Sequence, residues 1–112
     1  MRRCGDVQLA DLGEPQGWEA GFARPVVVMT AQAVLDQGPR VAQAVPLTST
    51  LRGHRSEVPI EPDPDNGLAV VSAAQCQHIR AIDVERLAEP VGNVGPQVLN
   101  QMREILADLL DL

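Results

Sequence analysis

Arginine and hydroxyl side chains recur where strands are predicted to begin or end. Arg24 opens a β-branched segment, Thr48 and Ser49 close an alternating segment, and Arg80 lies inside a third. Guanidinium and hydroxyl groups both donate hydrogen bonds to phosphate oxygens, and arginine does so through parallel donors. The pattern therefore indicates a site that binds or cleaves a phosphate group.

The chain is acidic overall, but its positive charge gathers in one segment. All nine basic residues are arginine, and the formal net charge is −6. Between residues 37 and 56, Arg40, Arg52 and Arg55 stand with His54 and no acidic residue. The net charge argues against a protein that holds nucleic acid by charge over its whole surface. The segment itself has two interpretations, a solvated loop and a local phosphate-binding patch.

Only two side chains are aromatic, Trp18 and Phe22, and both fall in one loop bracketed by glycines. Neither ring lies in a predicted strand or helix, so the core is expected to be aliphatic. Rings in such a loop can stack on the bases of single-stranded nucleic acid, at about 1–3 kcal/mol per base. The alternative is a loop that its two rings pin to the core.

Other catalytic constellations are absent from the sequence. There is no glycine-rich phosphate loop, no HExxH pair and no serine nucleophile elbow. His54, His78, Cys4 and Cys76 have no metal-ligand spacing, so we expect no metal and no other cofactor. Both cysteines are expected to be reduced thiols.

Length and hydropathy limit the organisation of the chain. A single domain over 1–112 is expected, and 45% hydrophobic with 21% charged residues is typical of a folded protein. The longest apolar runs are much shorter than the roughly 20 residues that cross a bilayer. The N-terminus has no apolar region of the kind found in secretory signals. We therefore expect a cytoplasmic protein without membrane contact.

Short strands must position the arginines and hydroxyls. Alternation and β-branched residues predict strands over 6–12, 25–30, 41–48, 57–60, 68–74, 77–82 and 91–94. In the first strand, Val7, Leu9 and Leu12 are expected to share a buried face. In the strand over 77–82, the two-residue period places His78 and Arg80 on one face.

One amphipathic helix is predicted after Gly95-Pro96. Apolar residues recur at three- and four-residue spacing from Val98 to Leu110. Proline is preorganised for the first helical turn. Short strands followed by one helix indicate a mainly β fold, a small curled sheet or barrel with the helix docked on it or on a partner.

Taken together, these segments resemble the MazF/PemK family of toxin endoribonucleases from bacterial toxin-antitoxin systems. The likeness covers nearly the whole chain and rests on the order and spacing of several motifs. The motifs are Gly5-Asp6-Val7 with Ala10-Asp11-Leu12, Gly17-x-Glu19-x-Gly21-x-x-Arg24-Pro25-Val26-Val27-Val28, Pro46-Leu47-Thr48-Ser49, Gln77-x-Ile79-Arg80-Ala81-Ile82-Asp83-x-x-Arg86-Leu87 and Leu109-x-Asp111-Leu112.

The resemblance implies a homodimer of small SH3-like barrels, each with five to seven short strands and a C-terminal amphipathic helix. It implies an mRNA interferase, a growth-inhibiting toxin that cuts single-stranded RNA at specific sequences without a metal. The RNA's own 2′-hydroxyl attacks, leaving a 2′,3′-cyclic phosphate and a 5′-hydroxyl end. A MazE-like antitoxin with an acidic, partly disordered tail is expected as partner. Operator DNA is expected to be contacted only through that antitoxin.

Arg24 and Thr48 match the usual catalytic pair of the family. A guanidinium and a hydroxyl can stabilise the charge that develops on the nonbridging phosphate oxygens. For Arg80 the alternative is an ion pair with Asp83 or Glu85. The residues expected to bind RNA are Trp18, Phe22, Ser49, Arg52, Arg55, Gln77 and Arg80.

One departure from the family pattern bears on mechanism. Family members commonly carry an acid and then glutamine before the Ile-Arg pair, where this chain has Gln77 and His78. An amide cannot take a proton from the 2′-hydroxyl. The general base is therefore expected to be His78 or Glu19. The alternative for His78 is a polar residue with a structural or RNA-binding role.

Two other functions suit the same fold. One is a non-nuclease toxin of the CcdB type, which poisons gyrase, and the other is a catalytically impaired relative that only binds antitoxin. CcdB-like chains place key contacts at a tryptophan-containing C-terminus, whereas this chain ends in Leu109-Leu110-Asp111-Leu112. The endoribonuclease is the favoured interpretation.

Overall fold

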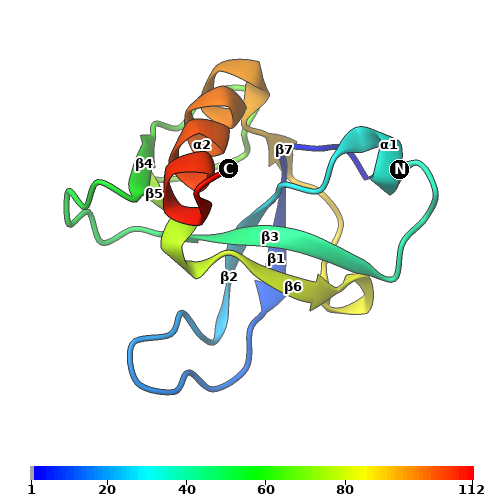
Figure 1. The fold of residues 1–112 in the computed structure, drawn as a ribbon, viewed down its shortest axis with the longest axis horizontal. Helices are drawn as coiled ribbons and strands as arrows, with labels where there is room; N and C mark the ends of the chain where they lie inside the picture. Colours follow the sequence, from blue (N-terminus) through cyan, green and yellow to red (C-terminus); the bar gives the residue numbers. More distant parts are fainter. Residues whose placement is uncertain (1) are drawn as a thin grey trace.

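The computed structural model describes residues 2–112, which form a curled antiparallel sheet covered by one long helix (Figure 1). None of the helices in this range is long and apolar enough to cross a membrane. In chain order the elements are β1 (Asp6–Asp11), β2 (Ala23–Val28), α1 (Gln32–Leu35), β3 (Val41–Thr48), β4 (Glu57–Ile60), β5 (Ser72–Gln75), the 3-10 helix η1 (Cys76–His78), β6 (Arg80–Asp83), the 3-10 helix η2 (Val84–Arg86), β7 (Gly92–Asn93) and α2 (Gly95–Leu110).

Strand β3 organises the sheet because it pairs with three other strands. Along one edge it pairs with β2, with Val26 opposite Pro46. Along the other edge its first half pairs with β6 and its last two residues pair with β5. β5 and β6 are therefore successive pieces of one edge, separated by the three residues of η1.

The segment after β6 curls the sheet toward closure. It leaves β3 and reaches the free edge of β1, where Ala88 N–H donates to the Leu9 carbonyl at 2.9 Å and Val91 N–H donates to the Val7 carbonyl at 2.8 Å. β7 then pairs with the start of β1. The expected mainly β barrel with a C-terminal helix is confirmed, in the form of a half-barrel sheet.

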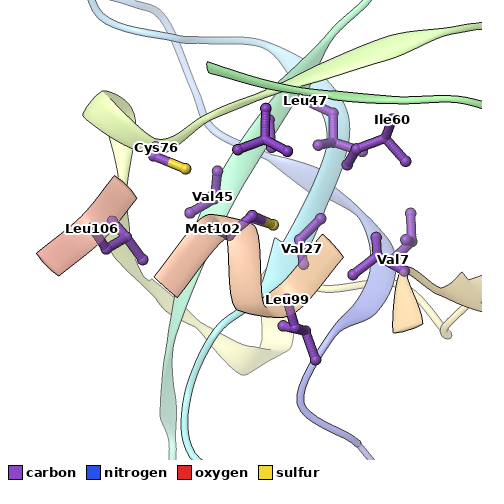
Figure 2. Close-up of a cluster of buried hydrophobic side chains, with 12 residues drawn as sticks. Val7, Val27, Val45, Leu47, Ile60, Cys76, Leu99, Met102 and Leu106 are labelled. Atoms are coloured by element: carbon purple, nitrogen blue, oxygen red, sulfur yellow. The ribbon is translucent and has the colours of Figure 1, made fainter. Parts of the chain in front are cut away.

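Aliphatic side chains from the sheet and α2 make the main core (Figure 2). Val7, Val27 and Val45 come from three adjacent strands and are fully buried. α2 contributes Leu99 and Met102 to the same cluster, together with Leu106 one turn further on. The amphipathic pattern thus packs the helix on its own sheet, because its apolar face covers the centre of the barrel.

Two predicted strands were wrong over part of their length. The strand predicted over 68–74 covers only Ser72–Gln75, because the preceding turn docks on the chain beside β7. In that turn Gly67 has a φ of +70°, and a Cβ there would overlap the Val91 carbonyl. The strand predicted over 77–82 starts only at Arg80, since residues 76–78 form η1. His78 therefore does not follow the strand alternation of Arg80.

The expectation for the first strand was wrong at one residue: Val7 and Leu12 are buried as expected, but Leu9 is not. Leu9 is 49% exposed, whereas Gln8 on the opposite face is buried. Gln8 Nε2 donates to the Ala88 carbonyl at 2.6 Å, and its Oε1 accepts from Arg2 Nε at 3.1 Å. Burial of the Gln8 amide leaves no polar atom without a partner, because both its nitrogen and its oxygen are hydrogen-bonded. Smaller shifts affect β2, which covers 23–28 rather than 25–30, and β7, which covers only 92–93.

Burial in the main core predicts an alkaline limit to stability through Cys76. Burial raises the pKa of this thiol from 9.0 to about 11, and the Glu57 carboxylate adds to the increase. As pH rises, the unfolded chain therefore loses the thiol proton first. The free energy of unfolding should be unaffected below the unfolded-state pKa and should fall by up to ~2–3 kcal/mol by the time pH passes the folded-state pKa.

Urea denaturation at about pH 8 and about pH 10.5 measures this loss. The chain has no lysine and no tyrosine, so few other groups titrate in this range. Cys76→Ala should remove most of the pH dependence, and the matched variant Cys4→Ala should retain it. Equal pH dependence in wild type and Cys76→Ala would contradict the prediction.

Candidate functional site

A cleft of about 490 Å³ opens between the β1–β2 loop and the loop that follows β3. Its walls come from β2, the end of β3, β4, β5 and η1, so the sheet holds most of its side chains in place. Most of the residues predicted for the site line this cleft. They are Trp18, Glu19, Arg24, Thr48, Arg52, Gln77 and His78.

The predicted residues outside the cleft lie at different distances from it. Phe22 and Ser49 line a neighbouring hollow of about 470 Å³, whose lining also includes Arg24 and Thr48. Arg55 is separate from both, because it lines a shallow surface beside α2. The basic segment is thus divided between the cleft, lined by Arg52 and His54, and the adjoining surface beside α2, lined by His54 and Arg55.

Arg80 lines a third hollow, of about 670 Å³, which shares Glu19 and His78 with the main cleft. Its Nη1 donates to the Leu12 carbonyl at 3.3 Å. Asp83, the expected alternative partner, instead accepts a hydrogen bond from the Glu85 backbone at 2.9 Å. Arg80 therefore lines the hollow next to the cleft and is not used in a local ion pair.

Arg24 is held by two neutral groups. Its Nε donates to the Gly21 carbonyl at 3.1 Å, and its Nη1 donates to Gln75 Oε1 at 3.2 Å. The only ion pair among residues 2–112 joins Arg52 to Glu57, so the guanidinium of Arg24 is not neutralised by a carboxylate. A fixed and uncompensated guanidinium is suited to binding an anion.

Thr48 faces Arg24 across the sheet. The β2–β3 register pairs Val26 with Pro46, and Arg24 and Thr48 each stand two positions further along in the same direction. Thr48 Oγ1 accepts a hydrogen bond from the Thr50 backbone at 3.1 Å. Because the oxygen is the acceptor in this contact, its hydrogen is free to be donated to a ligand.

The aromatic loop is not pinned to the core, so that alternative was wrong. Trp18 is 96% exposed and Phe22 is 61% exposed. The loop is instead closed at its neck by backbone hydrogen bonds, from Phe22 to Gly13 at 2.6 Å and from Leu12 to Phe22 at 2.9 Å. Phe22 has a φ of +61°, a conformation that costs a non-glycine residue about 1–2 kcal/mol. The neck therefore holds both rings out of the core.

Glu57, which no sequence motif singles out, lies at the start of β4 and lines the cleft. Its side chain is 2% exposed, and its Oε2 lies 4.0 Å from Nη1 of Arg52. The same oxygen accepts from Gln77 Nε2 at 2.9 Å. The available signal was its place as the first acid after a long segment without any. Thr50 and Gln75, also not predicted for the site, line the cleft as well, together with His54 of the basic segment.

Donors to an anion therefore dominate this cleft. Within residues 2–112 no three histidine, cysteine or carboxylate side chains form a group that could hold a metal ion. Arg24, Arg52 and the Thr48 hydroxyl converge on one space, beside an exposed ring that can cover a base. This arrangement fits a nucleotide phosphate with its attached base.

Comparison with known proteins identifies the family of the chain. Residues 3–110 match the family described as PemK-like, MazF-like toxin of type II toxin-antitoxin system. Endoribonuclease MazF9 of Mycobacterium tuberculosis is 35% identical over an alignment of 116 positions, which covers 100% of this chain and 98% of the relative.

Two solved structures share the fold. MazF from Deinococcus radiodurans has a TM-score of 0.83 and 28% identity, covering 99% of this chain and 97% of that one. An endoribonuclease in complex with its cognate antitoxin, from a mycobacterial species, has a TM-score of 0.78 and 25% identity, covering 100% and 97%. With a family match over nearly its whole length and a strongly similar solved fold, this chain belongs to the PemK-like, MazF-like toxins of type II toxin-antitoxin systems.

Proposed function

We propose that this chain, as a MazF-like toxin, is an endoribonuclease that cuts single-stranded RNA without a metal ion. One observation carries the assignment of the site. Arg24 and Thr48 project from adjacent strands into one cleft, the first with neutral partners only and the second with a hydroxyl hydrogen to donate. These are the donors that a phosphodiester needs as it accepts a fifth oxygen.

The reaction uses the substrate's own nucleophile. The 2′-oxygen attacks the adjacent phosphorus, and the 5′-oxygen leaves, which gives a 2′,3′-cyclic phosphate and a 5′-hydroxyl end. Negative charge grows on the nonbridging oxygens, where Arg24 and Thr48 stabilise it. Arg24 acts through its charge, because a guanidinium is a very poor acid.

The three adjoining hollows give RNA a continuous path. Phe22 and Ser49 lie beyond Arg24 on one side of the cleft, and Arg80 lies beyond His78 on the other. Trp18 stands at the cleft with its ring almost wholly in water. Stacking on rings holds bases of any sequence, so selection of the cut site depends on the polar side chains along the path.

Two protein partners complete the proposal. Leu109 and Leu110 are about half exposed at the end of α2, and Leu112 is 89% exposed. A second copy of the chain supplies an apolar surface for them, consistent with a homodimer. A MazE-like antitoxin with an acidic tail occupies the cleft in place of RNA, since carboxylates and phosphates are both bound by guanidinium groups such as Arg24 and Arg52.

The catalytic pair is tested by cleavage of long single-stranded RNA in the presence of EDTA. Wild-type protein should give fragments with 5′-hydroxyl ends. Arg24→Ala and Thr48→Ala should each slow cleavage by about 10²–10³-fold, because each removes a donor to the transition state. Arg40→Ala is the matched control, since Arg40 is exposed and lines no part of the cleft, and it should cut at the wild-type rate.

Two results would count against this assignment. Near-full cleavage by folded Arg24→Ala and Thr48→Ala variants would place the site elsewhere. Intact RNA together with trapped gyrase–DNA complexes would favour the CcdB-type alternative.

Base stacking is tested through Trp18, the only tryptophan of the chain. An RNA oligonucleotide with 2′-deoxy substitution at the cut site binds without being cleaved, and it should quench the tryptophan fluorescence. Trp18→Ala should weaken its binding by about 1–3 kcal/mol, whereas Trp18→Phe should retain most of the affinity. Unchanged fluorescence and unchanged affinity would show that the ring does not contact RNA.

The partners are tested by light scattering and by competition. At micromolar concentration the scattering mass should be twice the chain mass of 12.0 kDa, and a monomer would contradict the homodimer. A peptide rich in aspartate and glutamate should inhibit RNA cleavage, and added salt should relieve the inhibition because the contacts are ionic. Arg52→Ala should weaken inhibition, while a control at Arg86, outside the cleft, should not.

A further inference from the structure

The floor of the cleft holds a buried carboxylate to which the proposed function gives no role. One oxygen of Glu57, Oε2, is engaged by the Gln77 amide at 2.9 Å and by Arg52 at 4.0 Å. The other oxygen, Oε1, is buried and accepts no hydrogen bond from any of residues 2–112. Burying a carboxylate oxygen without a donor is unfavourable, so its presence at this site calls for a donor that arrives with the ligand.

Glu57 stands beside the residue that anchors the catalytic arginine. The β4–β5 register places Glu57 directly opposite Gln75, and Gln75 Oε1 accepts from Arg24 Nη1 at 3.2 Å. Both residues line the same cleft as Thr48. In RNA the 2′-hydroxyl is on the ribose that carries the scissile 3′-phosphate. A phosphate held by Arg24 therefore brings a hydroxyl donor to this part of the cleft.

We propose that Glu57 is the general base of RNA cleavage, an inference that rests on the proposed endoribonuclease function. Oε1 takes the proton of the 2′-hydroxyl while the 2′-oxygen forms its bond to phosphorus. The bond from phosphorus to the 5′-oxygen breaks, and that oxygen leaves with the electron pair and takes a proton from water. Glu57 then returns its proton to solvent, so charge and protons balance over the cycle.

Arg52 is the cation that contacts this carboxylate, through Oε2. Its side chain is 48% exposed, and its contact with Glu57 is at the 4.0 Å limit for an ion pair. Such pairs contribute little when one partner is in water. A phosphate entering the cleft competes with Glu57 for Arg52 and draws the guanidinium outward. Substrate binding thus separates Arg52 from the Glu57 carboxylate at the step that needs a base.

The two bases expected from the sequence are less well placed. Glu19 is exposed, and its Oε1 already accepts from the Gln16 backbone at 3.0 Å. His78 lies between the main cleft and the Arg80 hollow, in η1. Gln77 is a positioning residue, because its amide is fixed between the Ser56 hydroxyl at 2.9 Å and Glu57. The amide that replaces the family's common acid therefore orients a carboxylate supplied by β4.

The pH profile of cleavage is the appropriate readout because each titratable or charged group near Glu57 can be named and tested by substitution. Cys76 lies next to it in η1 and the core, and its raised pKa reflects the Glu57 charge. Asp108 of α2 lies beyond the 54–56 segment. The other titratable or charged groups around the same cleft are Glu19, Arg24, Arg52, His54 and His78.

The test measures single-turnover cleavage of an oligonucleotide with one ribonucleotide, in EDTA, from about pH 3.5, below the range in which carboxyl groups ordinarily titrate, to about pH 8.5. Wild type should lose activity toward acid as the base becomes protonated. Glu57→Gln should cut about 10²–10⁴-fold more slowly and should lose this acid limb. Glu57→Asp should keep the limb and recover part of the rate. Glu61→Gln, a matched change at an exposed residue just after β4, should behave as wild type.

A substrate with sulfur in place of the 5′-oxygen separates the two proton transfers. The sulfur leaves without a proton, so a defect in a base persists and a defect in an acid disappears. Glu57→Gln should remain slow on this substrate. Recovery to the wild-type rate would overturn the proposal, as would an unchanged acid limb in Glu57→Gln. Loss of that limb in Glu19→Gln or His78→Gln instead would also overturn it.

Binding of the 2′-deoxy oligonucleotide checks that the variant cleft is intact. If Glu57→Gln fails to bind, Glu57→Asp becomes the deciding variant. Partial activity of Glu57→Asp with the acid limb supports the proposal, and full wild-type activity at all pH values overturns it. Wild type that cuts RNA while Glu57→Gln cuts equally well removes only the role of Glu57. Wild type that leaves RNA intact removes the proposed function as well.

Discussion

Strand β3 must satisfy its backbone hydrogen bonds along two edges while the sheet around it curls, and the site depends on how it does so. One edge follows β2 without interruption, whereas the other is divided between β5 and β6. The break is filled by η1, which turns Gln77 and His78 toward the space beyond the end of β3. The cleft is thus the place where a curled sheet changes strand partners, with rigid pairing on either side of it.

Within that space the electrostatics are local. The chain is acidic as a whole, yet Arg24 is held by a carbonyl and an amide, so its charge is directed at the cleft. The buried carboxylate of Glu57 is close by, engaged on one oxygen only. The neutral amides of Gln75 and Gln77 contact Arg24 and Glu57 respectively, and the only cation paired with Glu57 among the described residues is the half-exposed Arg52. A direct ion pair between Arg24 and Glu57 would neutralise both groups.

The sequence predicted the elements that local patterns determine. Alternation identified β3 and β4 at their exact bounds, and three- and four-residue spacing identified α2. What it could not predict came from tertiary contacts: Gln8 is buried because its amide donates to the carbonyl of Ala88, far along the chain, whereas Leu9 is half exposed. The 3-10 helix η1 likewise interrupts the segment over 77–82, which its alternating pattern predicted to be one strand.

The candidate site shows the same division. Arg24 and Thr48 could be named from motifs, since their types and spacing are local properties of the chain. Glu57 could not, because its place in the cleft comes from strand pairing with Gln75 and from burial, which a single sequence does not display. The exposure of Trp18 likewise followed from the hydrogen-bonded neck of its loop.

That neck, formed by Leu12, Gly13 and Phe22, has a consequence for how the protein can evolve. Substitutions and insertions inside the loop can change which RNA is recognised, while the strands that carry Arg24 and Thr48 stay unaltered.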